Sequence, residues 1–575
     1  MATATKRGAR KTPVPNPPQV VATNKPKQML DGSRIGKWAP ARMAMEVDYQ
    51  VVRALRGGTT AMRSMREVFL PRDQGEREEP RLYNERLLRT FLSDGYGEGV
   101  ANIAARPFQR PVKLANAEKL PDMLQRIEVD ADRQGTSLTR LAHMALDSGT
   151  DRGAVHILVD MPAVAQKVDP LTNTPRDRTL QDDYDDDLRP YFCIVSADNL
   201  VNWAWRKDAT GRDVLAMVMI YEARDGVSLT GEVGTIERIR YWTETEWQVW
   251  EREGTAPMSA SAITTANDLL QVARMAGTQN EGNVQRPYKL VTFGGHDLGK
   301  VPIVSVVLNK YGNDRLQARP CLINCAWKNV EQWQIASSRA NVLWYSGFPI
   351  LVGAGLSAEQ VEEGVPLGAG AQYLSTNENA SVEFAEPGGI SAQSLKEREL
   401  ELIEQMKGMA LSPLLRVTGN KTATGEAIDE KQSQSLAQSW VEALEWGFYA
   451  AYEMAAKWIG KDLPEDFELS IFRDFSLGAR SATDLQTLDA ARARGDISRE
   501  TYIRELVERG VAVTITDVDD ELNRIADEGD KLAEMMPSPQ FGGGGGFGKN
   551  DFGGGDPNMP PPDKGAKPFP PKGDA

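Results

Sequence analysis

The sequence predicts an α+β protein with unstructured ends, because three features follow one another along the chain. Short apolar, strand-like runs cluster between residues 154 and 310. Long helical patterns without internal proline follow between 320 and 460, and both ends of the chain are rich in proline. A chain of 575 residues has the length of roughly three or four domains and can bury a large core.

The charge balance excludes a surface that is basic over the whole chain. Lys and Arg total 67 against 81 Asp and Glu, for a formal net charge of -14. Such a chain contacts nucleic acid only locally. Three cysteines in so long a chain favour assembly in a reducing compartment such as the cytoplasm, and neither a secretory signal nor a membrane span is predicted.

Both ends of the chain have the composition of disordered segments. Residues 1–36 form a basic arm, since the first 30 contain six basic residues and no acidic one. Residues 537–575 contain eleven glycines and nine prolines and are expected to be a flexible tail.

Residues 37–319 are predicted to begin with helices and to continue as a sheet. The helices are expected at 41–55 and 79–92, where Leu82, Leu87 and Leu88 are placed on one face. Residues 154–310 are expected to form one α+β unit with a mostly antiparallel sheet. Its strands are predicted at 154–159, 190–198, 214–220, 239–243, 247–249, 288–293 and 301–308.

Two long helices are predicted around a strand-like insert. The first covers 320–346, because Pro320 suits a first helical turn and neither proline nor glycine follows until Gly347. Residues 347–388 are glycine-rich and strand-like. The second helix lies within 389–411, where Ser394 and Glu397 have the spacing of a capping box.

A third long helix is predicted over 424–460, with Thr424 as its cap. One apolar face runs along it, and Gly447 in this face is either a kink or a close-packing site. The face consists of Leu436, Trp440, Leu444, Gly447, Ala451, Met454 and Trp458. A strand-like stretch in 461–480 and three short helices in 481–536, at 482–493, 498–508 and 519–533, complete the body.

Two glycine motifs invite a nucleotide-binding interpretation and do not support it. Residues 294–301 follow a phosphate-loop pattern until the last position, where Val301 replaces the required Ser or Thr and a strand follows instead of a helix. A hairpin turn is expected there. Residues 353–358 fit a dinucleotide fingerprint without a surrounding βαβ unit, so a glycine turn is expected.

No metal, cofactor or catalytic group is predicted. The acidic runs 182–187 and 517–521 lack the glycine and final glutamate of a calcium loop and are expected to be solvated. Cys321 and Cys325 share a helix face without two further ligands, so they are expected to be buried apolar side chains. His143 on a helix and His156 in a strand stand without a nucleophile motif; the third histidine is His296.

The order of these elements resembles the core of tailed-bacteriophage portal proteins, and short strings along residues 65–530 are similar to landmarks of one portal family. In chain order, these strings are Leu70-Pro71, Tyr83 with Arg86-Leu87, Pro107-Phe108 with Arg110-Pro111, 135–138, 158–162, 199–203, 347–350, 421–427, 495–498 and 508–510.

The resemblance implies a ring, usually of twelve copies, at one capsid vertex of a virion. A terminase motor pumps double-stranded DNA through such a ring, and the DNA later leaves through it. The implied partners are other copies of this chain, the major capsid protein, the terminase large subunit and head-tail adaptor or tail proteins. Neither catalysis nor a cofactor is implied, and no membrane is involved.

The family's parts carry over onto this chain as follows. The wing would be 37–319 with the return strand 461–480, the stem 320–346 and 389–411, the clip 347–388, the tunnel loop 412–423, the tunnel helix 424–460 and the crown 481–536. The DNA-channel residues would be Arg416, Asn420, Lys421, Lys396 and Arg398. The terminase- and adaptor-binding clip residues would be Gly353, Gly355, Glu359, Glu362, Glu363 and Glu378.

The net charge suits a DNA channel on physical grounds. Twelve chains at -14 sum to -168, and a mostly acidic channel would repel phosphates while a few basic rings centre the DNA. Arg416 and Lys421 are the hypothesised rings. Two other classes remain open: an enzyme, namely a packaging NTPase or nuclease, and a different non-catalytic virion component such as an adaptor or scaffold.

Overall fold

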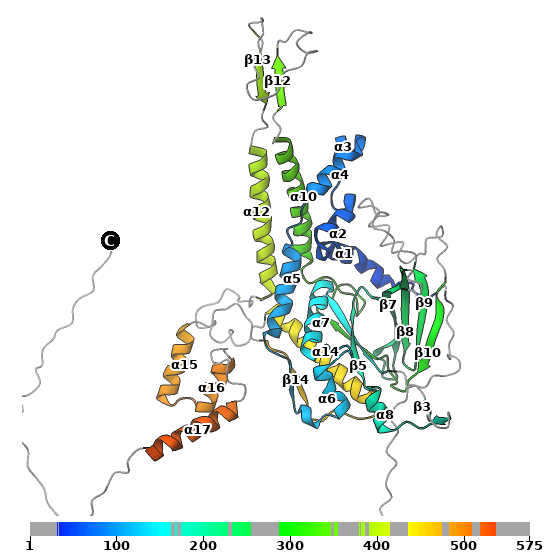
Figure 1. Cartoon of the computed structure of the whole chain (residues 1–575), viewed down its shortest axis with the longest axis vertical. Coiled ribbons are helices and arrows are strands. Elements are labelled where there is room, and N and C mark those ends of the chain that lie inside the picture. The colour runs from blue at the N-terminus through cyan, green and yellow to red at the C-terminus, as the bar shows by residue number, and fades with distance from the viewer. Residues whose placement is uncertain are drawn as a thin grey trace, which may run out of the picture. The chain divides into compact units, whose positions relative to one another are not determined.

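The computed structural model divides into two compact units, Met1–Gly478 and Ala479–Ala575. It describes residues 32, 34–162, 167–168, 174–227, 233–254, 287–346, 350–354, 379, 381–385, 390–414, 435–473, 482–508 and 518–535. The described part combines helices with antiparallel sheets, so the predicted α+β class is confirmed (Figure 1).

The strands of the first unit form two main sheets rather than the single sheet that the sequence predicted. One is a five-stranded meander in the order β10-β9-β8-β7-β6, and the other has the order β11-β2-β5. All of these pairs are antiparallel. The bounds are β2 Ala154–Asp160, β5 Tyr191–Ser196, β6 Leu200–Lys207, β7 Asp213–Val227, β8 Val233–Thr243, β9 Glu246–Gly254, β10 Lys289–Gly295 and β11 Ile303–Val307.

The phosphate-loop-like string lies between these two sheets. Strand β10 pairs with β9, whereas β11 pairs with β2, so residues 296–302 connect one sheet to the other. The predicted hairpin turn is therefore wrong. The predicted strand after Lys300 is present, and among the described residues no helix begins there.

Short paired strands complete the β-structure. They are β1 Lys113–Ala115 with β14 Glu468–Ser470, β3 Lys167–Val168 with β4 Pro175–Arg176, and β12 Ile350–Ala354 with β13 Ser381–Ala385. The β1–β14 pair joins the predicted return stretch to the N-terminal half of the chain.

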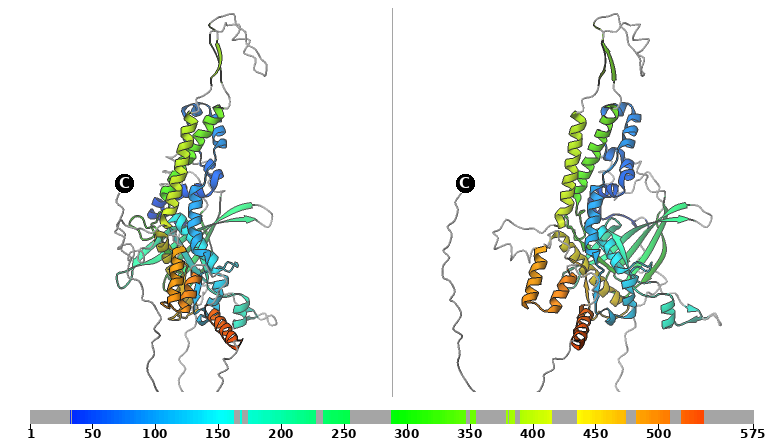
Figure 2. Two further views of the ribbon diagram at one scale, coloured as in Figure 1. Left: turned by 90° about the vertical axis from the view of Figure 1, so that its left-hand side faces the viewer. Right: turned by 60° about the vertical axis from the view of Figure 1, so that its left-hand side comes forward.

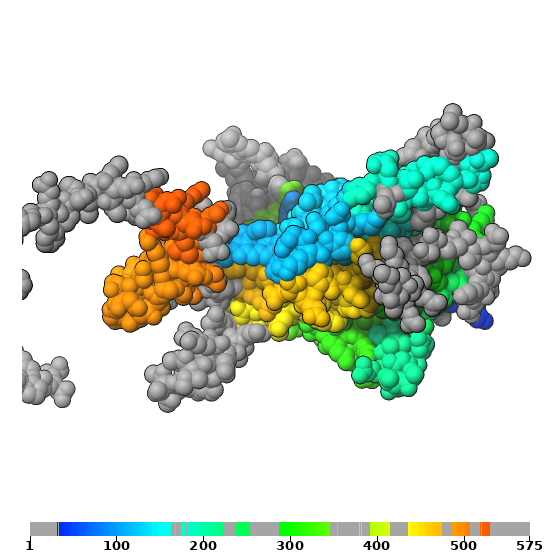
Figure 3. Space-filling view, turned by 90° about the horizontal axis from the view of Figure 1, so that it is seen from below, coloured from blue at the N-terminus to red at the C-terminus, as the bar shows by residue number. Residues whose placement is uncertain are grey.

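The helices of the first unit surround the sheets and extend away from them. They are α1 Pro40–Arg56, α2 Gly58–Ser64, α3 Gln74–Glu78, α4 Pro80–Arg89, α5 Gly95–Ala105, α6 Asp122–Val129, α7 Leu138–Arg152, α8 Leu180–Asp185, α10 Ile323–Ser346, α12 Ile390–Leu411 and α14 Leu436–Trp458. Figure 3 shows α14 in yellow alongside the blue and cyan segment that holds α6 and α7.

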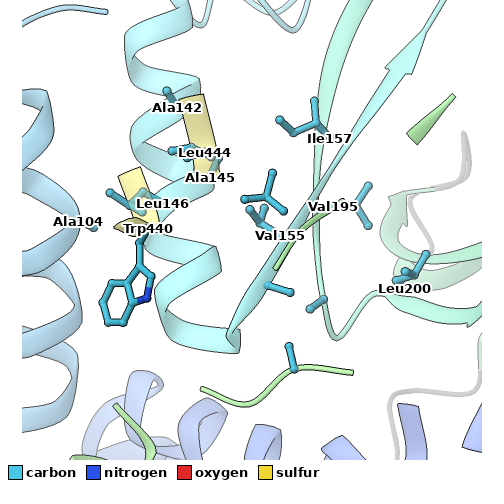
Figure 4. Packing of buried hydrophobic residues seen from close by; sticks show 14 of the residues in the cluster. Ala104, Ala142, Ala145, Leu146, Val155, Ile157, Val195, Leu200, Trp440 and Leu444 are labelled. Carbon is cyan, nitrogen blue, oxygen red and sulfur yellow. The ribbon is translucent and has the colours of Figure 1, made fainter. Parts of the chain in front are cut away.

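The core lies between α7, α14 and the sheet of β2. Trp440 and Leu444 of α14 meet Leu146 of α7 and Ile157 of β2, all of them nearly inaccessible to solvent (Figure 4). Burying a large apolar side chain contributes about 1.5–3 kcal/mol, so this cluster anchors α14 to the sheet.

Two predicted helix caps are wrong. Helix α12 begins at Ile390, directly after Gly388 and Gly389 as predicted, but Ser394 lies inside the helix and not at its cap. Helix α14 is capped by Ser435, whose hydroxyl accepts from the amide of Gln438 while the Gln438 side chain accepts from the amide of Ser435, a capping box. Thr424 is therefore not its cap, and the predicted segment 424–434 lies outside the described residues.

Two predicted apolar faces each include one residue that the fold leaves exposed. Leu87 is buried, but Leu88 keeps 65% of its surface accessible. Along α14 the predicted face is buried except for Leu436 at the first turn, which is 55% accessible. Adjacent positions on a helix differ by about 100°, and in α4 the buried side lies toward Tyr83 and Leu87 and away from Leu88.

The acidic run 182–187 is more ordered than predicted. Asp182 accepts from the amide of Thr179 at the start of α8, and its carboxylate also pairs with Arg176 at 2.6 Å. Asp183 and Asp186 both pair with Arg178. The carboxylates are neutralised by nearby arginines rather than simply solvated.

The described residues of the second unit form the three helices that the sequence predicted: α15 Ala482–Arg494, α16 Arg499–Glu508 and α17 Val518–Met535. Helix α16 contacts both α15 and α17. Ser498 begins α16, since its hydroxyl accepts from the amide of Thr501.

Candidate functional site

The most distinctive feature of the first unit is an antiparallel pair of long helices, α10 and α12, which we call the stem. The two helices lie side by side in all views and are joined at one end by the β12–β13 hairpin (Figure 2). Arg398 of α12 pairs with Glu331 of α10 at 2.5 Å, and Arg339 of α10 pairs with Glu399 of α12 at 2.7 Å. These ion pairs fix the register of one helix against the other.

The two predicted channel cations of the stem, Arg398 and Lys396, differ in whether they are paired with carboxylates. The hydrogen bond to Glu331 raises the pKa of Arg398, which also pairs with Glu401 at 2.7 Å. Arg398, a predicted DNA-channel residue, is thus held by two carboxylates. Lys396, also predicted, is exposed, and among the described residues no carboxylate lies within ion-pair distance of it.

At its other end the stem packs closely on α5. A Cβ on Gly99 would stand 2.8 Å from Cβ of Ala410 on α12. Only glycine allows the two helix backbones to approach this closely without a shift. This contact was not predictable from the sequence, because Gly99 lies in a glycine-rich stretch that could equally have been a loop.

A buried asparagine ties the stem to the chain that enters α5. Asn329 of α10 donates through Nδ2 to the carbonyl of Ser93 at 2.7 Å and accepts at Oδ1 from the amide of Tyr96 at 2.9 Å. The Tyr96 hydroxyl in turn donates to Oδ1 of Asp151 in α7 at 2.9 Å. All three side chains are buried, so these polar groups have exchanged water for one another.

The same polar network continues toward the sheets. Arg152 lies 3.2 Å from Asp198, which sits in the turn between β5 and β6. Burial alone would raise the pKa of Asp198, but Arg152 and its other partners lower it overall. For Asp151 burial is the stronger effect and raises the pKa. A continuous chain of buried polar side chains therefore links α10 to the turn between β5 and β6.

Strands β12 and β13 form a hairpin at the end of the stem. Ile350 is paired with Ala385, and Gly353 with Val382, in an antiparallel ladder. Gly353, a predicted clip residue, is thus in β12. The other predicted clip residues, Gly355, Glu359, Glu362, Glu363 and Glu378, lie outside the described residues, as do the predicted channel residues Arg416, Asn420 and Lys421.

The sequence did not predict that a third helix, α4, would pack beside α10. Around its end lies a group of exposed apolar side chains: Leu88 and Phe91, each 65% accessible, Leu343 at 51% and Trp344 at 47%. Together with Arg63 and Arg89 we call these residues the α4 patch. Leu88 was predicted to share one face with Leu82 and Leu87, so the sequence did not indicate that Leu88 would be exposed here.

The remaining candidate groups do not form a reactive site in the described part of the chain. There, no group of three His, Cys, Asp or Glu side chains is placed to hold a metal ion. His156 is buried in β2 against Ser305, and burial lowers its pKa to about 4. Burial raises the pKa of the Cys325 thiol to about 12. None of the described helices is both long and apolar enough to cross a membrane.

Comparisons with known proteins give one family and several solved structures. Residues 321–459, which run from the start of the stem to the end of α14, match the family described as a domain of unknown function (DUF4055). The match covers less than half of the chain. Curated proteins gave no match.

The chain is also similar to chains of gene transfer agent (GTA) particles. One is from the virion of a native particle, with a TM-score of 0.32 and 12% identity, covering 70% of this chain and 87% of that chain. Another is from the neck of an empty particle computed with C6 symmetry, with a TM-score of 0.33 and 11% identity, covering 72% of this chain and 88% of that chain. A third is from the neck of a native particle computed with C12 symmetry, with a TM-score of 0.33 and 12% identity, covering 71% of this chain and 88% of that chain.

Proposed function

We propose that this chain is a portal protein. Copies of it assemble into a ring, expected to contain twelve, at one vertex of a viral capsid. Double-stranded DNA enters through the ring during packaging and leaves through it during ejection. The chain is assembled in the host cytoplasm, resides in the virion and contacts the major capsid protein.

The observation that carries this proposal is the stem. Two helices of 24 and 22 residues, about 36 and 33 Å long at 1.5 Å per residue, stand side by side and end in a small hairpin. Their exposed surface includes Trp327, Trp344 and Leu400. A monomer would leave these side chains in water, whereas neighbouring stems in a ring would cover them.

The segment between the stem helices is the expected docking site for the terminase large subunit and later for head-tail adaptor or tail proteins. Strands β12 and β13, which lie between α10 and α12 in the chain, pair with each other at the tip of the stem, and they are the described part of the proposed clip 347–388. A tip of this kind, repeated around a ring, presents many copies of one short segment to a partner. Gly353, Gly355 and the glutamates at 359, 362, 363 and 378 are the residues proposed for this contact.

The proposed channel is acidic, with local cations. At -14 per chain, twelve chains sum to -168, so DNA would slide without adhering over most of the surface. Lys396, Arg416, Asn420 and Lys421 are proposed to contact DNA. Arg398 is the weakest of the predicted channel residues, because its charge is taken up by Glu331 and Glu401.

The chain is proposed to be non-enzymatic, with DNA movement driven by a separate motor. A packaging NTPase would need a phosphate loop, and the string that ends at Lys300 passes into strand β11 rather than into a helix. No observation favours a nuclease. Absence of ATP hydrolysis by the purified chain would agree with this assignment, and ATP hydrolysis lost on changing Lys300→Ala would overturn it.

The mass of the purified full chain tests the proposal. Twelve chains of 63.3 kDa give particles of about 760 kDa, which single-particle images should show as rings with a central opening. A population of monomers or dimers at micromolar concentration would contradict the portal assignment.

A further inference from the structure

The α4 patch is an apolar surface with an excess of positive charge. The guanidinium of Arg63 lies 4.7 Å from the ring centre of Phe91, and that of Arg89 lies 4.5 Å from the ring centre of Trp344. Arg63 also donates to the carbonyl of Leu88 at 2.7 Å. Among the described residues no carboxylate lies within ion-pair distance of Arg63, whereas Arg89 has Glu85 at 3.6 Å. The contacts therefore join Arg63, Leu88 and Phe91 into one surface.

A second surface, on α12, centres on an exposed leucine. Leu402 and Met406 are buried, and Leu400, two residues before Leu402, points about 200° away and is 52% accessible. Glutamates lie one turn to either side of Leu400; Glu401 pairs with Arg398 at 2.7 Å and Glu404 with Lys407 at 2.8 Å. We call Glu397, Leu400, Glu401 and Glu404 the α12 outer face. Among the described residues, Glu397 has no basic partner within ion-pair distance.

Hydrogen bonds place both surfaces at the same height along the stem. On the α4 side, Thr90 donates to the hydroxyl of Ser337 at 2.9 Å, and the amide of Ser93 lies 3.4 Å from Oε1 of Gln332. On the α12 side, the same Gln332 donates through Nε2 to Glu399 at 3.2 Å. Phe91 and Leu400 are thus both next to residues that contact the segment of α10 between Gln332 and Ser337.

We propose that the α4 patch of one copy packs against the α12 outer face of the adjacent copy. The inference rests on the proposed ring, and it names the surfaces that meet in the stem. Rotation about an axis along the stem keeps every residue at its own height, so only surfaces at equal height can meet. The two surfaces differ, as a head-to-tail contact that closes a ring requires. Among the described residues, Arg63 has no carboxylate and Glu397 no basic group within ion-pair distance in its own copy, so the contact can bring these two opposite charges together.

A disulfide cross-link tests the contact directly. The full chain carrying both Phe91→Cys and Leu400→Cys, mildly oxidised, should give a ladder of covalent oligomers on a non-reducing gel. Burial raises the pKa of Cys193 and Cys325 to about 12, so these native thiols should react slowly. The single variants, and Phe91→Cys combined with Val129→Cys on α6, should give no ladder.

A charge placed on the outer face provides a second readout. Leu400→Lys removes an apolar contact and brings a cation toward Arg63, so the concentration at which half of the chains are in rings should rise about tenfold or more. Val129→Lys, at a site that is 74% accessible, should leave it unchanged. Circular dichroism and the melting temperature establish that both variants are folded.

The outcomes separate this inference from the proposed function. If the unmodified chain forms rings but the Phe91/Leu400 pair gives no ladder, or only a bond within one chain, the contact is wrong and the portal proposal stands. If the unmodified chain forms no ring, the portal proposal itself fails. A ladder with folded, ring-deficient Leu400→Lys supports the contact.

Discussion

Gly447 of α14 lies against Val306 of β11 so closely that a Cβ on the glycine would stand 2.3 Å from Cγ2 of Val306. The sequence left two explanations for this glycine, a kink or a close-packing site. The structure has one continuous helix from Leu436 to Trp458, so close packing is the explanation. The glycine allows the helix to lie directly on the sheet.

Gly447→Ala is therefore expected to destabilise the protein, although alanine favours helix by about 1 kcal/mol. Val306 is β-branched and buried, so it cannot rotate away, and the overpacking should cost about 1–3 kcal/mol. The matched control is Gly408→Ala in α12, where no atom lies within 4 Å of the added Cβ. Urea unfolding should show a loss of stability for the first variant and a gain for the second. Equal gains for both would contradict the close-packing explanation.

Asn329→Ala should weaken the attachment of the stem. The change leaves the carbonyl of Ser93 and the amide of Tyr96 without their partner, and each unsatisfied buried group costs about 1–3 kcal/mol. We expect a loss of about 2 kcal/mol or more in urea unfolding and faster amide hydrogen exchange near Tyr96. Asn324→Ala, at an exposed position on α10, is the control and should change little. If Asn329→Ala is as stable as this control, the hydrogen bonds of Asn329 do not contribute to the stability of the protein.

Helices and strands with a clear periodicity of apolar residues were predictable from the sequence. Helix α10 ends where predicted and begins three residues later than predicted, and β2 begins at Ala154 as predicted. Helix starts were less predictable, because Thr424 and Ser435 are equally good caps by residue type. What selects Ser435 is the tertiary packing of Trp440 and Leu444, which periodicity alone does not locate.

The stem was predictable, but its contacts were not. Arg398 was identified as a candidate channel cation from its charge and position, yet it bridges Glu331 and Glu401. A residue list gives the charge of a side chain and not its partners, which depend on how α10 and α12 are aligned. The α4 patch was missed for the same reason, since α4 and Trp344 are more than 250 residues apart.

His156 should make stability depend on pH below neutrality. Its pKa falls to about 4 on folding, because burial in β2 disfavours the charged ring, against about 6.5 when unfolded. Between these values only the unfolded chain binds the proton, so stability is fully present above pH 6.5 and falls as the pH drops toward 4.

Comparing His156→Gln with the unmodified chain isolates this effect from the titration of carboxylates. The stability advantage of the unmodified chain should be smaller by about 2 kcal/mol at pH 5.0 than at pH 7.5, from 1.36 kcal/mol per pKa unit. The half-buried His143 should show a smaller effect in His143→Gln. A constant difference between the two pH values would mean that His156 is reached by water in the folded protein.

Lys396 and the pair Arg416 and Lys421 provide the test of the channel hypothesis. If these cations centre DNA in the ring, changing Arg416 and Lys421 together to Ala should reduce the packaging or retention of the genome without dissolving the ring, since local charges act on DNA through phosphate contacts. Lys396→Ala should act in the same direction, because its charge is not neutralised within the stem.

Arg398→Ala is the matched control: it should lower the stability of the stem slightly, as expected for a partly exposed ion pair, and leave DNA retention unchanged. Encapsidated DNA length measured for each variant, beside ring mass, separates the two effects. Genome filling equal to that of the unmodified chain in the Arg416/Lys421 double variant would contradict the assignment of these residues to the channel.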